Sequence, residues 1–410
     1  MPLEVITAKQ FQEFYHALQS KSFMQSVEMA ELLKKRGYQV TYLGLRAEET
    51  LQVTALLFSL PMTGGLHMEI NSGPVSRDKH YLKQFYQELQ RYAKENGALE
   101  LLVKPYDTYQ HFDTNGEPTD QENTALLDDF LSLGYQHDGL LTGYPGGEPD
   151  WHYVKDLTDL DEKTLLKSFS KKGRPLVKKA KTFGITLRKL NREELPLFKE
   201  ITSATSDRRD YVDKSLDYYQ DFYDSFGDSC EFMVASLNFQ DYFAHLETNK
   251  AKLDQRIEKL RTAIEQNNTS EKKHNQLREL SSQSATFETR MAEAKEFIGK
   301  YGSQNLVLAG SLFVYTKQEA VYLFSGSYPE FNKFYAPALL QEYVMLEAIK
   351  RGITTYNLLG ITGEFDGSDG VLRFKQNYNG YITRKMGTFR YYPHPLKYKC
   401  IHALKKILRP

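Results

Sequence analysis

The chain of 410 residues is long enough for two domains, and its 28 Tyr and 24 Phe supply ample core, which excludes a disordered protein. Its apolar runs are far shorter than the roughly 20 residues of a membrane-spanning helix, and no secretory leader is expected. Only two cysteines occur, Cys230 and Cys400, far apart in the chain. This excludes a disulfide framework and a Cys-rich zinc module, and it favours a cytoplasmic location.

Charge is distributed unevenly, although basic and acidic residues number 53 each. Residues 163–192 contain eleven Lys or Arg and no Asp or Glu, and residues 370–410 contain ten and none. The other 339 residues hold the remaining 32 basic side chains and all 53 acidic ones. Two cationic segments on an acidic body indicate anionic partners at those segments: phosphate, nucleic acid or an anionic membrane face.

The order of predicted elements repeats along the chain. In the first 150 residues, strand-like runs at 38–45, 51–60 and 67–71 precede a helix at 81–95 and a strand at 99–103. Later, strand-like runs at 306–315 and 320–325 precede a helix at 339–350 and a strand at 354–359. The repetition predicts two similar α/β domains related by an internal duplication.

A segment of another kind separates these halves. Residues 228–298 contain neither Gly nor Pro, and leucines fall seven residues apart at positions 246, 253 and 260. The polar run 267–270 then provides a turn, after which a second helical pattern begins. The pattern predicts an antiparallel coiled-coil hairpin inserted into the second domain.

Signatures of metal or nucleophile chemistry are absent, because the sequence has no HExxH, no paired Cys/His spacing, no GxSxG and no Walker loop. No metal and no cofactor are therefore expected.

The informative residues are basic and aromatic. The candidates for phosphate or nucleic-acid binding share one short run: Lys171, Lys172, Arg174, Lys178, Lys179 and Lys181. Further candidates follow at Arg208 and Arg209, and in the block that contains Arg373, Phe374 and Lys375.

Five motifs are distinctive when taken together: FMQSVEMAELLKKRGYQV (23–40), SGPV (72–75), VKPYDTYQHFDTNGE (103–117), EELPLFKEITSATS (193–206) and GVLRFKQNYNG (370–380). Through these motifs the chain resembles the Fem family of peptidoglycan aminoacyltransferases over essentially its whole length, in its FemA, MurM and MurN branch and most of all MurN. The resemblance implies two acetyltransferase-like (GNAT-like) domains with a coiled-coil arm. The implied ranges are 1–153 with 385–410 for the first domain, 154–238 with 301–384 for the second, and 239–300 for the arm.

The resemblance also implies an activity: transfer of an amino acid, alanine for a MurN-like protein, from aminoacyl-tRNA onto the stem-peptide amine or branch of lipid II. Phe374 and Lys375 correspond to the family's active-site Phe-Lys pair. Lys34 or Lys35 corresponds to a phosphate-contacting lysine, and Arg208 or Arg209 to a substrate-binding arginine. Tyr106 and Arg373, within the matching motifs, complete the predicted substrate-binding residues. Where FemA-like sequences have Asp-Pro, this chain has Lys104-Pro105, which favours substrate-assisted proton transfer over a carboxylate base.

Two other functions stay open at the level of sequence. A CoA-dependent N-acetyltransferase would need a glycine-bearing pyrophosphate loop that opens a helix, and none is in register. A non-catalytic RNA-binding or scaffold protein is the second alternative. The basic C-terminal tail, with leucines at 396, 404 and 408, predicts an amphipathic helix in peripheral contact with the inner membrane face.

Overall fold

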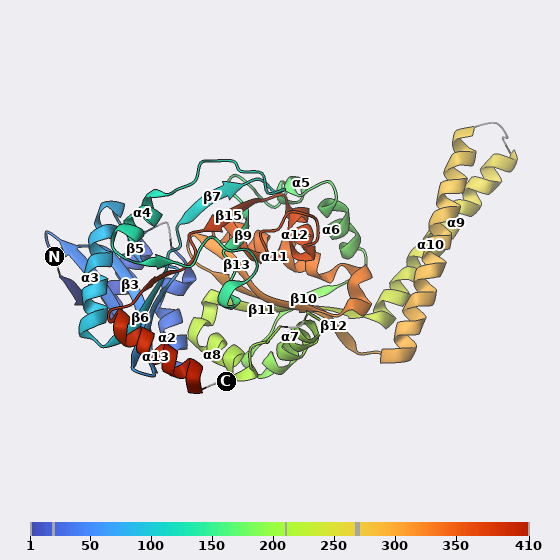
Figure 1. The fold of residues 1–410 in the computed structure, drawn as a ribbon. Helices are drawn as coiled ribbons and strands as arrows, with labels where there is room; N and C mark the ends of the chain where they lie inside the picture. The colour runs from blue at the N-terminus through green and yellow to red at the C-terminus, as the bar shows by residue number, and fades with distance from the viewer. Residues whose placement is uncertain (1, 19–20, 210, 267–270, 409–410) are drawn as a thin grey trace.

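The computed structural model describes residues 2–408 apart from 19–20, 210 and 267–270, and it contains two mixed β-sheets with helices packed against them (Figure 1). A two-helix arm projects from the second sheet. The first sheet runs, in spatial order, β1 (Leu3–Val5), β2 (Gln39–Ala47), β3 (Thr50–Met62), β4 (Gly65–Asn71), β6 (Ala98–Lys104), β16 (Phe389–Tyr391) and β8 (Gln136–His137), with β5 (Val75–Ser76) paired to β3. The second runs β10 (Thr186–Lys189), β11 (Cys230–Asn238), β12 (Asn305–Tyr315), β13 (Glu319–Ser327), β14 (Thr355–Ile361), β9 (Trp151–Asp156), β15 (Tyr381–Lys385) and β7 (Thr108–Phe112).

The helices connect these strands and cover both sheets. In chain order they are α1 (Ala8–Ala17), α2 (Val27–Lys35), α3 (Leu82–Glu95), α4 (Ala125–Ser132), α5 (Leu165–Ser168), α6 (Gly173–Lys181), α7 (Leu195–Arg209), α8 (Leu216–Phe226), α9 (Phe239–Gln266), α10 (Glu271–Tyr301), α11 (Ala336–Lys350), α12 (Gly370–Lys375) and α13 (Pro395–Leu408). In the part of the chain that is described, no helix combines the length and the apolar character needed to cross a bilayer.

Both sheets contain the same unit, as the repeated order of elements predicts. Three antiparallel strands, β2–β3–β4, are followed by α3 and then by β6, which pairs parallel to β4. In the second sheet β11–β12–β13 are followed by α11 and then by β14, which pairs parallel to β13. The predicted α/β class with two acetyltransferase-like halves is confirmed.

The two sheets exchange strands between the halves of the chain. Strand β7, which comes from the predicted first-domain range 1–153, pairs with β15 in the second sheet. Strand β16, which comes from the range 385–410, pairs with β6 and β8 in the first sheet. The predicted domain boundaries remain a prediction, although β7 falls in the first predicted range and belongs to the second sheet.

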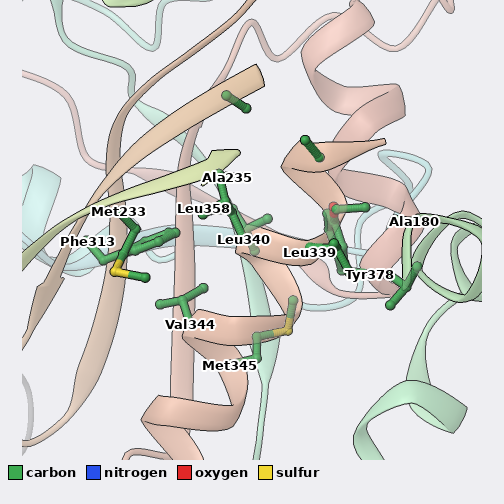
Figure 2. Close-up of a cluster of buried hydrophobic side chains, with 14 of the residues drawn as sticks. Ala180, Met233, Ala235, Phe313, Leu339, Leu340, Val344, Met345, Leu358 and Tyr378 are labelled. Carbon is green, nitrogen blue, oxygen red and sulfur yellow. The ribbon is translucent and has the colours of Figure 1, made fainter. Parts of the chain in front are cut away.

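Helix α11 fills the centre of the second domain. Figure 2 shows its side chains between the sheet, represented by Met233, Ala235 and Phe313, and the region of α6, represented by Ala180. These residues are all buried. A second buried cluster joins the halves of the molecule, because α1 and α2 of the first half and α7 and α8 of the second contribute to one core.

The arm consists of α9 and α10, which pack side by side and extend away from the sheets (Figure 1). Leu253, Ile257 and Leu280 are buried between the two helices. The predicted turn at 267–270 lies outside the described residues. At the root of the arm, Phe239 and Phe297 stack with ring centroids 4.5 Å apart and pack onto the segment that precedes α11.

Candidate active site at the seam between the two halves

Lys375 is a buried lysine at the end of α12, with 3% of its surface exposed. The helix begins at Asp369, whose carboxylate accepts hydrogen bonds from the backbone N–H groups of Val371 and Leu372. The Lys375 Nζ donates to two carbonyl oxygens of β14, those of Leu359 at 3.0 Å and Gly360 at 2.5 Å. A charged lysine has three N–H donors, so one remains available for a further acceptor.

Strand β14 is irregular at the point where it provides those two carbonyls. Its parallel pairing with β13 ends at Asn357, and its register with β9 shifts between Asn357 and Gly360. Leu359, inside this irregularity, has the left-handed φ of 56°. Buried carbonyls need donors, and the Lys375 ammonium supplies them.

The charge of Lys375 is finely balanced. Its pKa is lowered to about 7, mainly by burial; the Asp369 carboxylate opposes this shift, and the Arg209 guanidinium adds to it. Arg209 ends α7, and its neighbour Arg208 donates from Nη1 to the Ser327 carbonyl at 3.1 Å, which ties the end of α7 to the end of β13. Arg209 therefore lies near enough to Lys375 for its charge to act on that lysine, and a shared site for the two stays a prediction.

The other two predicted residues of the block lie around Lys375. The Phe374 ring, which is half-buried, packs edge-on against Tyr378 at 5.5 Å. Arg373 is exposed and donates from Nη1 to the Gly367 carbonyl, so it holds the loop that precedes α12.

A segment from the first half of the chain closes over this centre. The Tyr144 hydroxyl donates to the Gly360 carbonyl at 3.3 Å. Four residues later, the Glu148 carboxylate accepts hydrogen bonds from Asn71 and from the Lys104 Nζ, the latter at 2.9 Å. Lys104 also pairs with Glu69 at 2.9 Å. The segment 144–150 thus links the surroundings of Lys375 to the ends of β4 and β6.

Carboxylates are therefore present beside Lys104-Pro105, although the sequence departs from the family pattern there. Glu69 and Glu148 bind Lys104 directly, and Asp150 lies close by. Burial raises the pKa of Asp150 to about 6; the positive charge of Lys104 lowers it and the negative charge of Glu148 raises it. Sequence reasoning missed Glu148 and Asp150. The signal that was available is a pair of acids around Pro149, directly before the strand of Trp151.

Tyr106 lies in a buried polar network that joins the two halves. Its hydroxyl donates to Glu319 Oε2 at 2.7 Å, and Asn357 Nδ2 donates to the same oxygen at 3.2 Å. Lys385 lies 3.8 Å from the Tyr106 ring centroid and donates to its carbonyl oxygen. Burial raises the pKa of Glu319 and lowers the pKa of Lys385 to about 8. This environment fits a structural tie, so the predicted substrate contact of Tyr106 stays a prediction.

The predicted lysines of α2 lie at the exposed end of that helix. Lys34 pairs with Glu31 of its own helix at 2.7 Å, and the charge of Lys35 acts on Asp224 of α8. The next residue, Arg36, pairs with Asp221 at 3.3 Å. Arg36 and Glu148 both act on the pKa of Tyr218, which burial raises to about 12. Arg36 thus makes an ion pair with the second half of the chain, which the motif match did not indicate.

The predicted phosphate-binding run forms α6 and the turn before it. Lys171, Arg174, Lys178 and Lys179 line one open groove. Lys172 is exposed at the helix start and is not among the lining residues. Lys181 points to α11, where its Nζ binds the Glu342 carboxylate at 2.8 Å. Among the described residues, no group of three or more His, Cys, Asp or Glu side chains is placed to hold a metal ion.

Comparison with known proteins agrees with this architecture. Residues 6–406 match the FemAB family. The chain is 29% identical to the aminoacyltransferase FemA of Staphylococcus aureus (strain bovine RF122 / ET3-1), with 98% of each chain covered. It is 28% identical to FemA of Staphylococcus epidermidis (strain RP62A), again with 98% of each covered. The crystal structure of FemX superposes with a TM-score of 0.77 at 22% identity and covers 97% of this chain and 98% of its own. The choice of MurN within the branch stays a prediction, whereas the family is shown: this chain belongs to the FemAB family.

Proposed function

We propose that the protein is a tRNA-dependent aminoacyltransferase that adds an amino acid, alanine in the first instance, to the stem-peptide amine or branch of lipid II, and so builds the peptidoglycan bridge. Membership of the FemAB family and relatives named aminoacyltransferase FemA support this reaction class. The single structural observation that carries it is Lys375, a buried ammonium with one unused N–H at the seam of the two halves.

The chemistry needs positioning more than a protein nucleophile. An aminoacyl ester is already activated, so the acceptor amine attacks the ester carbonyl, a tetrahedral oxyanion forms, and the ribose oxygen leaves. The free N–H of Lys375 stabilises the oxyanion, and the positive charge of Arg209 strengthens the effect. The acceptor amine loses its proton as the bond forms, and the leaving ribose oxygen takes a proton in the substrate-assisted route. Glu148 and Asp150 line the approach from the first half.

Coenzyme A is a poor alternative donor for this site. Acetyltransferases of this general fold hold a pyrophosphate at the start of the helix that follows the three antiparallel strands of the unit, which corresponds to α11 here. In this chain that helix begins with Tyr335 in the left-handed region and carries Pro337 in its first turn. Phe331 and Phe334 pack there against the arm root. The residues present do not fit a pyrophosphate.

The direct experiment mixes the purified protein with lipid II and alanyl-tRNA, with and without ribonuclease. The expected result is a lipid II product heavier by one alanyl residue, which ribonuclease abolishes. Seryl- and glycyl-tRNA in parallel reactions identify the preferred amino acid, and lipid II that already carries one bridge residue distinguishes first from second addition. Absence of product with every donor and acceptor, while RNA still binds, would favour a non-catalytic RNA-binding protein.

We also propose peripheral contact with the cytoplasmic face of the membrane through α13. The helix is docked on the first sheet by Ile401, whose Cδ1 lies 2.1 Å from the position of a Cβ at Gly64. Leu396 and Leu404 are 79% and 57% exposed. Lys397, Lys399 and Lys405 are on the same helix, and Arg409 lies outside the described residues. Exposed leucines among lysines suit an anionic bilayer surface, where a lipid-linked acceptor resides.

A further inference from the structure

The basic helix α6 and the arm form one cationic groove, here called the root groove. It has a volume of about 660 Å³ and lies open to solvent. Four of its cations come from α6 and the turn before it, and the fifth, Arg290, comes from α10 more than one hundred residues later. The lining is completed by Pro175 and Thr182, and among these described lining residues none is acidic.

The cations of the root groove are held apart from carboxylates. Arg290 lies over the Phe183 ring at 5.5 Å, and Lys179 lies over the Tyr335 ring at 5.3 Å. Arg174 donates from Nε to the Phe169 carbonyl at 2.8 Å, which leaves its other donors free for a ligand. Within the described ranges, none of the five forms an ion pair, whereas Lys181 of the same helix does.

The root groove begins next to the Lys375 block. A Cβ built on Gly173 would lie 2.0 Å from the Asn377 carbonyl oxygen, so the start of α6 is in direct contact with that backbone. The same oxygen accepts a hydrogen bond from the Ser170 backbone N–H at 3.0 Å. Lys178 is five residues into the helix from Gly173, which is about 7.5 Å along its axis. One end of the groove therefore lies beside the backbone of Asn377, which is two residues from Lys375 in the sequence.

The form of the groove indicates a chain of phosphates. Arg174 and Lys178 are four residues apart, so they share one helix face and form a row together with Lys171. A single phosphate is typically held in a closed nest of converging donors, whereas an open row suits a polymer backbone. Residues 239–300 of the arm contain eleven basic and ten acidic side chains, so the arm as a whole lacks the net charge that would attract such a polymer.

We propose that the root groove binds the sugar–phosphate backbone of RNA, and that the arm contributes to this contact only at its root, through Arg290. The proposal rests on the proposed function for the identity of the RNA, a donor tRNA whose aminoacylated end then reaches Lys375. Groove and reaction centre are coupled through the contact between Gly173 and Asn377.

The test measures the affinity of the full-length protein for a short RNA hairpin by fluorescence anisotropy at several salt concentrations. The groove variant is Lys178→Gln/Lys179→Gln/Arg290→Gln. The matched control is Lys252→Gln/Lys259→Gln/Lys272→Gln, which removes the same charge from exposed positions along the arm. Losing three phosphate contacts is expected to lower the slope of log K against log salt by about 2 to 3 and to weaken binding at low salt at least tenfold. The control is expected to keep the wild-type slope.

Three results would overturn the proposal: an unchanged slope in the groove variant, an equal loss in the control, or inorganic pyrophosphate competing at the same concentration as RNA phosphate. Loss of binding to anionic vesicles with unchanged RNA binding would assign the groove to a membrane and likewise sink it. The measurement requires no transfer reaction. If RNA binds through the groove but no aminoacyl transfer occurs, the proposed function alone is rejected. If transfer occurs and the groove variant binds RNA as the wild type does, this inference alone is rejected.

Discussion

Lys375 has two tasks, one in the structure of β14 and one in the proposed reaction. Two of its N–H groups hold carbonyls of β14 in place, and the third faces the proposed reaction. Lys155 of β9 is equally buried and donates at 3.5 Å to the carbonyl of Asn379, near the end of the 370–380 motif. The two lysines therefore provide a matched pair: Lys375 lies at the proposed site, and Lys155 lies on β9, the strand next to β14.

Lys375→Met is expected to lower turnover by roughly 10²–10³-fold, which is the scale of losing one oxyanion donor. The measurement is the rate of product formation with saturating aminoacyl-tRNA and lipid II. Lys155→Met is expected to cost stability in thermal unfolding while most turnover remains. Turnover close to that of the wild type in Lys375→Met would remove this residue from the mechanism.

The pH dependence of activity follows from the lowered pKa of Lys375. With a pKa of about 7, the ammonium is present at lower pH and is lost as the pH rises through 7. Because kcat/KM reports the free enzyme, it is expected to fall up to tenfold per pH unit on the alkaline side. Lys375→Arg keeps its charge, so its lower activity is expected to lack this alkaline fall. A wild-type profile that rises steadily to pH 9 would contradict the role of the ammonium.

At the scale of elements, the position of α6 depends on the absence of a side chain at Gly173. Its neighbour in space is backbone, the Asn377 carbonyl, which has no rotamer to move aside. The helix carries the root groove, and the segment that contains Asn377 continues from Lys375. This close contact therefore sets the distance between the root groove and Lys375.

Gly173→Ala is expected to destabilise the protein by about 1–3 kcal/mol, because the added Cβ must displace backbone. It is also expected to lower turnover more than it lowers RNA affinity. Urea unfolding and transfer kinetics measure the two effects. Gly299→Ala in α10 is the control: nothing lies within 4 Å of its Cβ, and it is expected to gain up to about 1 kcal/mol from helix propensity. Equal behaviour of the two variants would show that the contact is not restrictive.

Helix α13 allows the membrane proposal to be tested without disturbing its docking residue Ile401. Leu396→Gln/Leu404→Gln removes the two exposed leucines and is expected to reduce sedimentation with anionic vesicles several-fold, while thermal unfolding stays unchanged. Neutral vesicles serve as the reference, because each lysine near an anionic surface contributes about 1 kcal/mol. Undiminished sedimentation of the variant would show that the leucines do not contact the bilayer.

Local sequence patterns predicted most helices and strands. The features that they did not predict depend on contacts between distant parts of the chain. The apolar, strand-like run at 51–60 and the helical spacing at 81–95 match β3 and α3, because both signals are contained in a few neighbouring residues. The partners of β7 and β16 lie on other parts of the chain, so no local pattern identifies them. At the proposed site, motif matching pointed to Lys375 and Arg209, whose roles stay predictions. It did not identify Glu148 or Arg36, whose positions result from tertiary contacts with Lys104 and Asp221.

At the scale of the whole molecule, the halves are joined by more than a linker. Each sheet contains a strand from the other half of the chain, and one buried cluster includes helices from both halves. The network of Tyr106, Glu319 and Asn357 adds buried hydrogen bonds across the same seam.

The sheets and the shared core are therefore expected to unfold in one cooperative transition, and residues 1–153 alone are not expected to form a stable domain. Differential scanning calorimetry of the full chain checks the first statement, and the circular dichroism and proteolytic resistance of the fragment check the second. Two separated calorimetric transitions, or a protease-resistant fragment, would contradict this view.

The position of β16 also has a consequence for biosynthesis. Strand β16 lies between β6 and β8, and among the described strands β8 pairs with β16 alone. A nascent chain that has completed β6 must grow by about 285 residues before Phe389 is made. The first sheet therefore keeps an open edge along β6 over that whole interval, and exposed edges invite pairing with other chains. The N-terminal half reaches its final fold only after most of the second half has been made, so its strands need chaperone protection in the meantime.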